Sequence, residues 1–172
     1  VGYHIPIVIG VGNHDVGYNA HNNHNLDPDR LPNYIYFFPQ HFAQDKTGTL
    51  VVTDFNERKT FFHHRIGNAI FFGLDSFYNN DYNGSQAAYI SAVSQNNTGK
   101  GKFAYYHVPT YPACQNDVNS PPTIRNYAQN VWAPIFETYK FNGIFENHVH
   151  MFKKTAPLKG GIIDYENGVV YY

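Results

Sequence analysis

Residues 143–150 of this 172-residue chain read GIFENHVH, a short apolar run that ends in two histidines. The run predicts a strand over residues 143–146, and His148 and His150 follow it at once. Two histidines two positions apart share one face if the strand continues, whereas on a loop they can reach two separate metal ions. Because the chain contains ten histidines, this pair alone is weak support for a metal site.

The same arrangement occurs twice earlier in the chain. The apolar run IPIVIGV at residues 5–11 predicts a buried strand, and Gly12-Asn13-His14-Asp15 follows it. A further strand is predicted over residues 102–108, and His107 lies near its end. In α/β sheets ligands bind beyond the carboxyl ends of the strands, so three adjacent strands would bring these residues together. Imidazole nitrogens and amide oxygens are metal ligands, and the three places together therefore predict a metal site.

The rest of the chain predicts strands mixed with helices. The helices are expected over residues 85–95 and over 123–140, where Pro134 should kink or divide the helix. Polar or proline-containing loops are expected over 17–33 and 113–122. The further strands are expected at 34–38 and 50–55, in a hairpin of 60–66 with 69–74 around Gly67-Asn68, and in a final hairpin of 160–164 with 169–172. The predicted class is α/β (mixed α+β), with hairpins around a sheet core.

Composition excludes several kinds of protein. Lys plus Arg number 12 and Asp plus Glu number 13, a net charge of −1, which argues against a nucleic-acid binder or a polybasic membrane binder. No apolar run approaches ~18 residues, so no membrane span is predicted. Two sequons, at Asn83 and Asn96, are candidate glycosylation sites. They favour a secreted, extracellular or lysosome-like location, and the alternative is that they are two ordinary polar loops.

Three segments resemble the last three of five signature blocks of calcineurin-like metallophosphoesterases, in particular the purple acid phosphatase-like branch. They are Gly12-Asn13-His14-Asp15, residues 104–111 (AYYHVPTY) and Asn147-His148-Val149-His150. Residues 66–76 resemble the central hairpin of that branch, and 133–140 resemble the helix before its final histidine block. The resemblance spans residues 7–172 and implies a four-layer αββα sandwich, with two central sheets flanked by helices.

The resemblance also implies a dinuclear site of two divalent or trivalent transition metal ions (Fe, Zn or Mn). By motif position, Asn13, His107 and His148 would bind the second metal and His150 the first. His14 would face the substrate phosphate and help to protonate the leaving oxygen. The implied activity is metal-dependent hydrolysis of a phosphate ester, on a small molecule or a phosphoprotein. A nuclease or nucleotidase would use the same site on another substrate.

The sequence departs from this family at its start. The first two blocks of the family lie upstream of Gly12 and supply the bridging carboxylate, but only residues 1–11 precede Gly12 here, and none is Asp or Glu. We therefore expect one metallophosphoesterase domain over 1–172 that is truncated at the N-terminus and also at the C-terminus, and that is inactive alone. The alternative is a degenerate, non-catalytic scaffold in an extracellular assembly.

Two further departures lie near the last block. Asn147 replaces the usual glycine, and because asparagine tolerates a left-handed backbone, the turn can survive. Lys153-Lys154 stands where the branch often carries Glu-Arg. The acidic partner at this place is lost, which is expected to alter how the segment docks or what the outer pocket binds.

Overall fold

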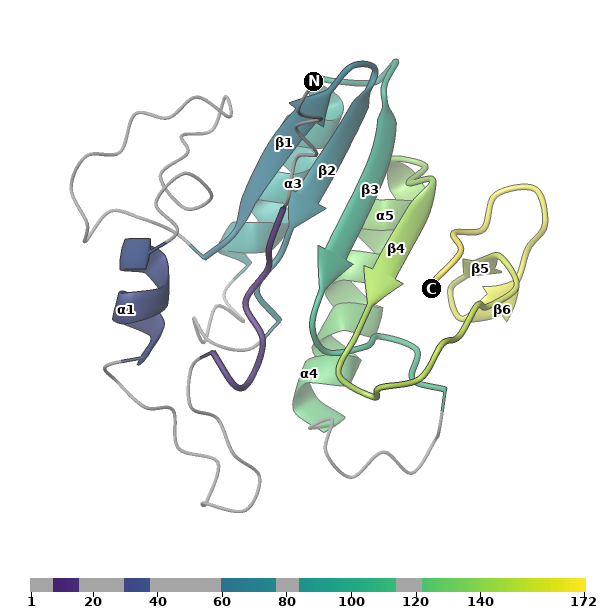
Figure 1. Cartoon of the computed structure of the whole chain (residues 1–172). Helices are drawn as coiled ribbons and strands as arrows, with labels where there is room; N and C mark the ends of the chain where they lie inside the picture. Colours follow the sequence, from purple (N-terminus) through teal and green to yellow (C-terminus); the bar gives the residue numbers. More distant parts are fainter. Residues whose placement is uncertain (1–7, 16–29, 38–59, 77–83, 114–121) are drawn as a thin grey trace, which may run out of the picture.

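The structure, a computed structural model, describes residues 8–15, 30–37, 60–76, 84–113 and 122–172 (Figure 1). Its centre is a four-stranded sheet in the order β1-β2-β3-β4. The strands are β1 (Phe62–Ile66), β2 (Ala69–Gly73), β3 (Gly101–Tyr106) and β4 (Gly143–Glu146). The pair β1 and β2 is antiparallel, whereas β2, β3 and β4 run parallel. The strands β3 and β4 therefore end at the same edge.

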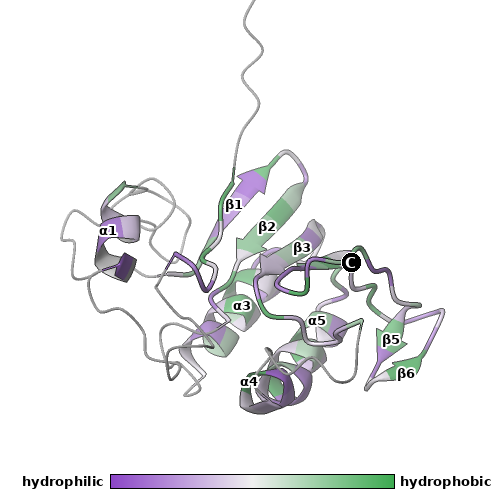
Figure 2. Ribbon diagram, turned by 60° about the horizontal axis from the view of Figure 1, so that its bottom comes forward, coloured by the Kyte–Doolittle hydropathy of each residue, from purple (hydrophilic) through white to green (hydrophobic). Residues whose placement is uncertain are grey.

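Helices cover one face of this sheet. The helix α3 (Ser85–Gln95) connects β2 to β3, and α4 (Pro122–Tyr127), the π-helix η2 (Ala128–Trp132) and α5 (Ala133–Thr138) connect β3 to β4. Both connections step in the same direction across the sheet, so the right-handedness of parallel crossovers places both on one face. Figures 1 and 2 show α3, α4 and α5 together on that face.

The core lies between the sheet and these helices. Every second strand residue is buried on this side, as the alternation of a pleated strand requires: Ile70, Phe72, Ala104, Tyr106 and Ile144. The ring of Tyr106 lies 5.2 Å from that of Trp132 and 6.4 Å from that of Phe136, between ring centroids. In Figure 2 the strand β2 is coloured mainly as apolar, whereas β1 and part of β3 are coloured as polar.

Five sequence predictions are confirmed. The hairpin of β1 and β2 turns at Gly67, whose φ is +57°, and α3 has the predicted bounds. The strand β4 has the predicted bounds, and β3 covers 101–106 where 102–108 was expected. The long helix is divided before Pro134, because proline lacks an N–H and its ring clashes with the carbonyl four residues earlier. The wider π turn absorbs this, and the Ala133 N–H donates to the Ala128 carbonyl, five residues back.

Two predicted strands near the N-terminus are wrong in their described parts. Residues 34–37 belong to the helix α1 (Arg30–Phe37), which also takes residues 30–33 from the predicted loop. The aromatic residues favoured a strand, but a proline in the first turn, here Pro32, is compatible with a helix.

Residues 8–11 form no strand. Instead the carbonyls of Ile9 and Gly10 accept hydrogen bonds from the hydroxyls of Tyr105 (3.4 Å) and Tyr34 (3.0 Å). The strand predicted at 50–55 lies outside the described residues.

The C-terminal hairpin is also corrected. The strands β5 (Leu158–Lys159) and β6 (Ile162–Ile163) pair around Gly160 and Gly161, whose φ values of +57° and +77° suit a tight hairpin turn. Residues 170–172 instead run beside β4. The Ile144 N–H donates to the Val170 carbonyl (3.0 Å), and the Glu146 N–H donates to the Tyr172 carbonyl (2.8 Å). No helix in the described part is long and apolar enough to cross a bilayer.

Candidate metal centre

Three predicted site residues meet at the edge of the sheet where β3 and β4 end. His107 directly follows β3, and His148 lies two residues beyond β4. The Nδ1 atom of His148 lies 3.1 Å from Nε2 of His107, and the same Nε2 lies 2.7 Å from Oδ1 of Asn13. His14 and His150 are exposed, but both lie near enough to affect the charge of His107. The predicted convergence of three segments is therefore present.

A glycine brings the turn of residues 12–15 close to His107. The Asp15 N–H donates to the Gly12 carbonyl (3.1 Å), and the Gly12 N–H donates to Oδ2 of Asp15 (2.8 Å). A Cβ atom on Gly12 would lie 3.3 Å from Nδ1 of His107 and 3.3 Å from Oδ2 of Asp15. Such contacts are tight, so the absence of a side chain at Gly12 allows Asn13 to reach His107.

The turn after β4 differs from the one expected from the sequence. Left-handed φ values fall on His148 (+69°) and His150 (+53°), and Asn147 is not among the residues of positive φ. Instead Asn147 joins the two strand ends. Its N–H donates to the His107 carbonyl (3.1 Å), and its side-chain amide donates to the Tyr106 carbonyl (3.0 Å). A left-handed non-glycine residue costs about 1–3 kcal/mol and persists where its surroundings fix it, as at functional sites.

The environment of His107 favours a neutral imidazole. Burial, and after it the nearby imidazoles of His148, His14 and His150, together lower the pKa of His107 to about 4. A histidine must be neutral to bind a metal ion. His107 therefore keeps a lone pair available over the whole neutral range of pH.

The three donor atoms at this edge are of the kinds that bind metal ions. Each nitrogen of a neutral imidazole either donates a hydrogen bond or accepts one. Nε2 of His107 therefore cannot donate to one of its two neighbours, Oδ1 of Asn13 and Nδ1 of His148, and accept from the other. A bound cation would instead accept a lone pair from each of the three atoms, Nε2 of His107, Nδ1 of His148 and Oδ1 of Asn13. Oδ1 of Asn13 and Nδ1 of His148 lie 2.7 Å and 3.1 Å from Nε2 of His107, so these three residues would hold a metal ion if one bound there. Within the described ranges no group of three His, Cys, Asp or Glu could hold a metal, so the set depends on Asn13.

An ion pair behind this site was not predicted from the sequence, although Lys153 was noted as unusual at its position. Glu146 and Lys153 form an ion pair in which the Glu146 side chain is completely buried. The sequence signal that pointed to this pair was the unusual lysine at position 153. Of the sequon residues, Asn96 is exposed at the end of α3, whereas Asn83 lies outside the described part of the chain.

The described elements form a mixed α/β sheet with histidines after the ends of two adjacent parallel strands. Among the solved structures, the chain is similar to a purple acid phosphatase isolated from seeds of yellow lupin (Lupinus luteus). The TM-score is 0.50 and the sequence identity is 17%. The match covers 73% of this chain and 24% of the chain of that enzyme. At this identity the similarity shows the fold. No family profile matches the sequence, and no curated protein matches it.

Proposed function

We propose that this chain is part of a metal-dependent phosphoesterase that hydrolyses phosphate esters, carried by a small molecule or a phosphoprotein. The observation that carries the proposal is the convergence of Asn13, His107 and His148 at one sheet edge. A fold similar to that of a purple acid phosphatase supports it. The chain spans only 24% of the length of that phosphatase. The enzymatic activity and the substrate of the whole protein are therefore part of this proposal.

In this proposal each site residue has one role. Asn13, His107 and His148 hold one metal ion of a pair drawn from Fe, Zn and Mn, and His150 contributes to the other. When bound, such a pair polarises a phosphate P–O bond and lowers the pKa of a water molecule. His14 is exposed on the turn beside Asn13, where its imidazole can contact the phosphate and donate a proton to the leaving oxygen.

The test is metal content and activity in the natively purified protein that contains this chain. We expect close to two transition metal ions per chain, and we expect Asn13→Ala and His148→Ala each to abolish phosphatase activity and to lower metal content. His64→Ala on the edge strand β1 is the matched control, since it removes an imidazole outside the site. Turnover like that of the wild type in either site variant would contradict the assignment.

A second candidate is a degenerate, non-catalytic scaffold. The observation that favours it is the donor set, which contains two imidazoles and one amide within the described residues but no third His, Cys, Asp or Glu. The same measurement separates the two candidates. Natively purified protein with almost no bound metal would favour the scaffold, and a search for protein partners would then replace a search for substrates.

Secretion and glycosylation at Asn83 and Asn96 complete the proposal. The exposed position of Asn96 at the end of α3 makes it accessible to a glycosyltransferase. If both sites are used, treatment with a peptide N-glycosidase should increase the electrophoretic mobility of the secreted protein in two steps. Replacing Asn96 by Gln should remove one of them.

A further inference from the structure

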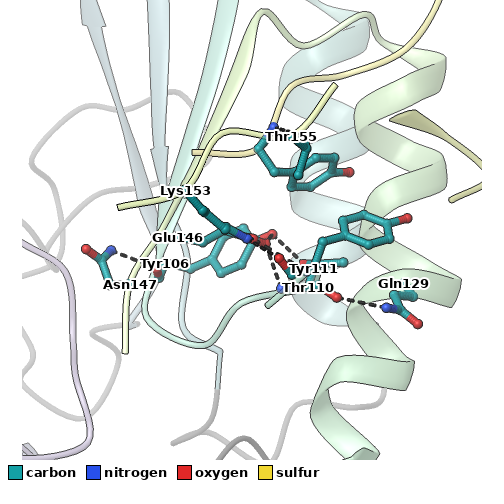
Figure 3. A network of polar contacts seen from close by, with 9 residues as sticks. Tyr106, Thr110, Tyr111, Gln129, Glu146, Asn147, Lys153 and Thr155 are labelled. Carbon is teal, nitrogen blue, oxygen red and sulfur yellow. Dashed lines mark hydrogen bonds and ion pairs between the residues drawn. The ribbon is translucent and has the colours of Figure 1, made fainter. Parts of the chain in front are cut away.

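A buried ion pair lies directly behind the candidate metal centre. Glu146 is the last residue of β4, and its side chain has no exposed surface, whereas that of Lys153 is 12% exposed. The Lys153 ammonium donates to Oε2 of Glu146 and to the Tyr111 carbonyl, as Figure 3 shows. A buried carboxylate is tolerated only where a cation and hydrogen bonds compensate for its lost hydration.

The carboxylate of Glu146 also holds the loop that follows His107. Its Oε1 accepts hydrogen bonds from the Tyr106 hydroxyl (2.6 Å) and from the Thr110 N–H (2.6 Å). The Tyr106 hydroxyl in turn lies 2.5 Å from that of Thr110. Figure 3 shows these groups gathered around Glu146. One carboxylate therefore connects the end of β3, the end of β4 and the loop of residues 108–111.

This cluster lies where the regular sheet pairing ends. The last paired residues of β3 and β4 are Tyr106 and Glu146 themselves. His107 follows the first of them directly, His148 lies two residues after the second, and Lys153 lies three residues after His150. The pair therefore joins both sides of the turn of residues 147–152, in which His148 and His150 hold a left-handed backbone. Such a backbone persists only where neighbouring contacts fix it.

We propose that Glu146 and Lys153 are positioning residues, whose ion pair fixes the 147–152 turn against the loop after His107 and so sets the spacing of His107 and His148. The part of this inference that concerns metal affinity rests on the proposed function. The part that concerns the distance between the two imidazoles does not, because that distance exists in the metal-free chain.

The test uses Co²⁺ as the probe and the full 172-residue chain. Lys153→Met removes the charge and keeps the aliphatic stem, Lys153→Arg restores the charge, and Lys154→Met is the matched control. Lys154 is exposed and lies over the ring of Tyr172, 5.8 Å from its centroid, away from Glu146. We expect Lys153→Met to bind Co²⁺ about tenfold more weakly, as for other residues that support metal ligands. Lys153→Arg should recover most of this loss, and Lys154→Met should change nothing.

A second readout separates this inference from the proposed function. In the metal-free chain, NMR cross-relaxation between the rings of His107 and His148 should be strong in the wild type and in Lys154→Met, and lost in Lys153→Met. If the wild type binds no Co²⁺, the metal function fails and this readout decides the positioning role. A folded Lys153→Met with unchanged cross-relaxation would overturn the inference. If Lys153→Met does not fold, Tyr106→Phe decides in the same way, since it removes one hydroxyl bond to Glu146 and keeps the ring.

Discussion

At the scale of single residues, His107 is the most constrained member of the candidate metal centre. It lies between Asn13 and His148, half-buried, behind the turn that Gly12 permits. Burial and the neighbouring imidazoles lower its pKa from 6.5 to about 4. Folding therefore favours the neutral ring, which is the form that binds a metal.

The lowered pKa of His107 predicts how the stability of the metal-free chain depends on pH. Below pH 6.5 the unfolded chain takes up a proton that the folded chain takes up only near pH 4. The contribution of His107 is thus fully present above pH 6.5 and is lost as the pH falls to about 4. Urea unfolding at pH 7, 5.5 and 4.5 should show a smaller loss of stability in His107→Gln than in the wild type. The control His64→Gln should follow the wild type, and equal losses in all three would contradict the prediction.

The left-handed backbone at His150 gives a second prediction at this scale. Glycine adopts this conformation without the penalty of about 1–2 kcal/mol that other residues incur. In the metal-free chain we expect His150→Gly to be more stable than His150→Ala by about 1 kcal/mol. At Val149, whose φ is not positive, the order should be reversed, with alanine more stable than glycine. Chemical unfolding of the four variants measures both differences, and alanine more stable at both positions would be evidence against a left-handed His150.

At the scale of elements, the C-terminal segment depends on one close backbone approach. Gly168 precedes the residues that run beside β4, and a Cβ atom there would lie 2.4 Å from the Asp164 carbonyl oxygen and 2.5 Å from the Pro157 carbonyl carbon. These atoms belong to the backbone and cannot move aside cheaply. We expect Gly168→Ala to destabilise the chain by about 2 kcal/mol or more. Gly99→Ala, with nothing within 4 Å of its Cβ, should stay close to the wild type in thermal unfolding.

At the scale of the whole molecule, the sheet and the helices share one core. Phe136 of α5 is completely buried, and its ring contacts Tyr106 of β3 and Phe141. Phe136→Ala should therefore cost about 3–5 kcal/mol of unfolding free energy through the cavity that it leaves. Phe152→Ala is the control, because 89% of that side chain is exposed. Calorimetry that finds equal melting temperatures for the two variants would mean that Phe136 is not part of the core.

The candidate site shows where reasoning from the sequence succeeded and where it stopped. His107 and His148 could be predicted together, because each follows an apolar run and parallel strands end at one edge. Asn13 was predicted by the same reasoning and lies beside His107, although residues 8–11 form no strand. The ion pair of Glu146 with Lys153 could not be predicted, because a glutamate at the end of a strand has no local signal that distinguishes it from a solvated one. The sequence indicated only that Lys153-Lys154 replaces the Glu-Arg common in the family, and the structure pairs Lys153 with Glu146.

The elements that could be predicted are those whose signals are local in the sequence. Turn glycines and the spacing of apolar residues fixed the β1–β2 hairpin, α3, β3 and β4, and Pro134 fixed the division of the long helix, because these effects act within a few residues. In contrast, the pairing of residues 170–172 with β4 and the helix at residues 30–37 depend on the folded environment and not on local signals. The backbone of an extended segment can pair with any free strand edge, so burial and the position of distant segments choose its partner.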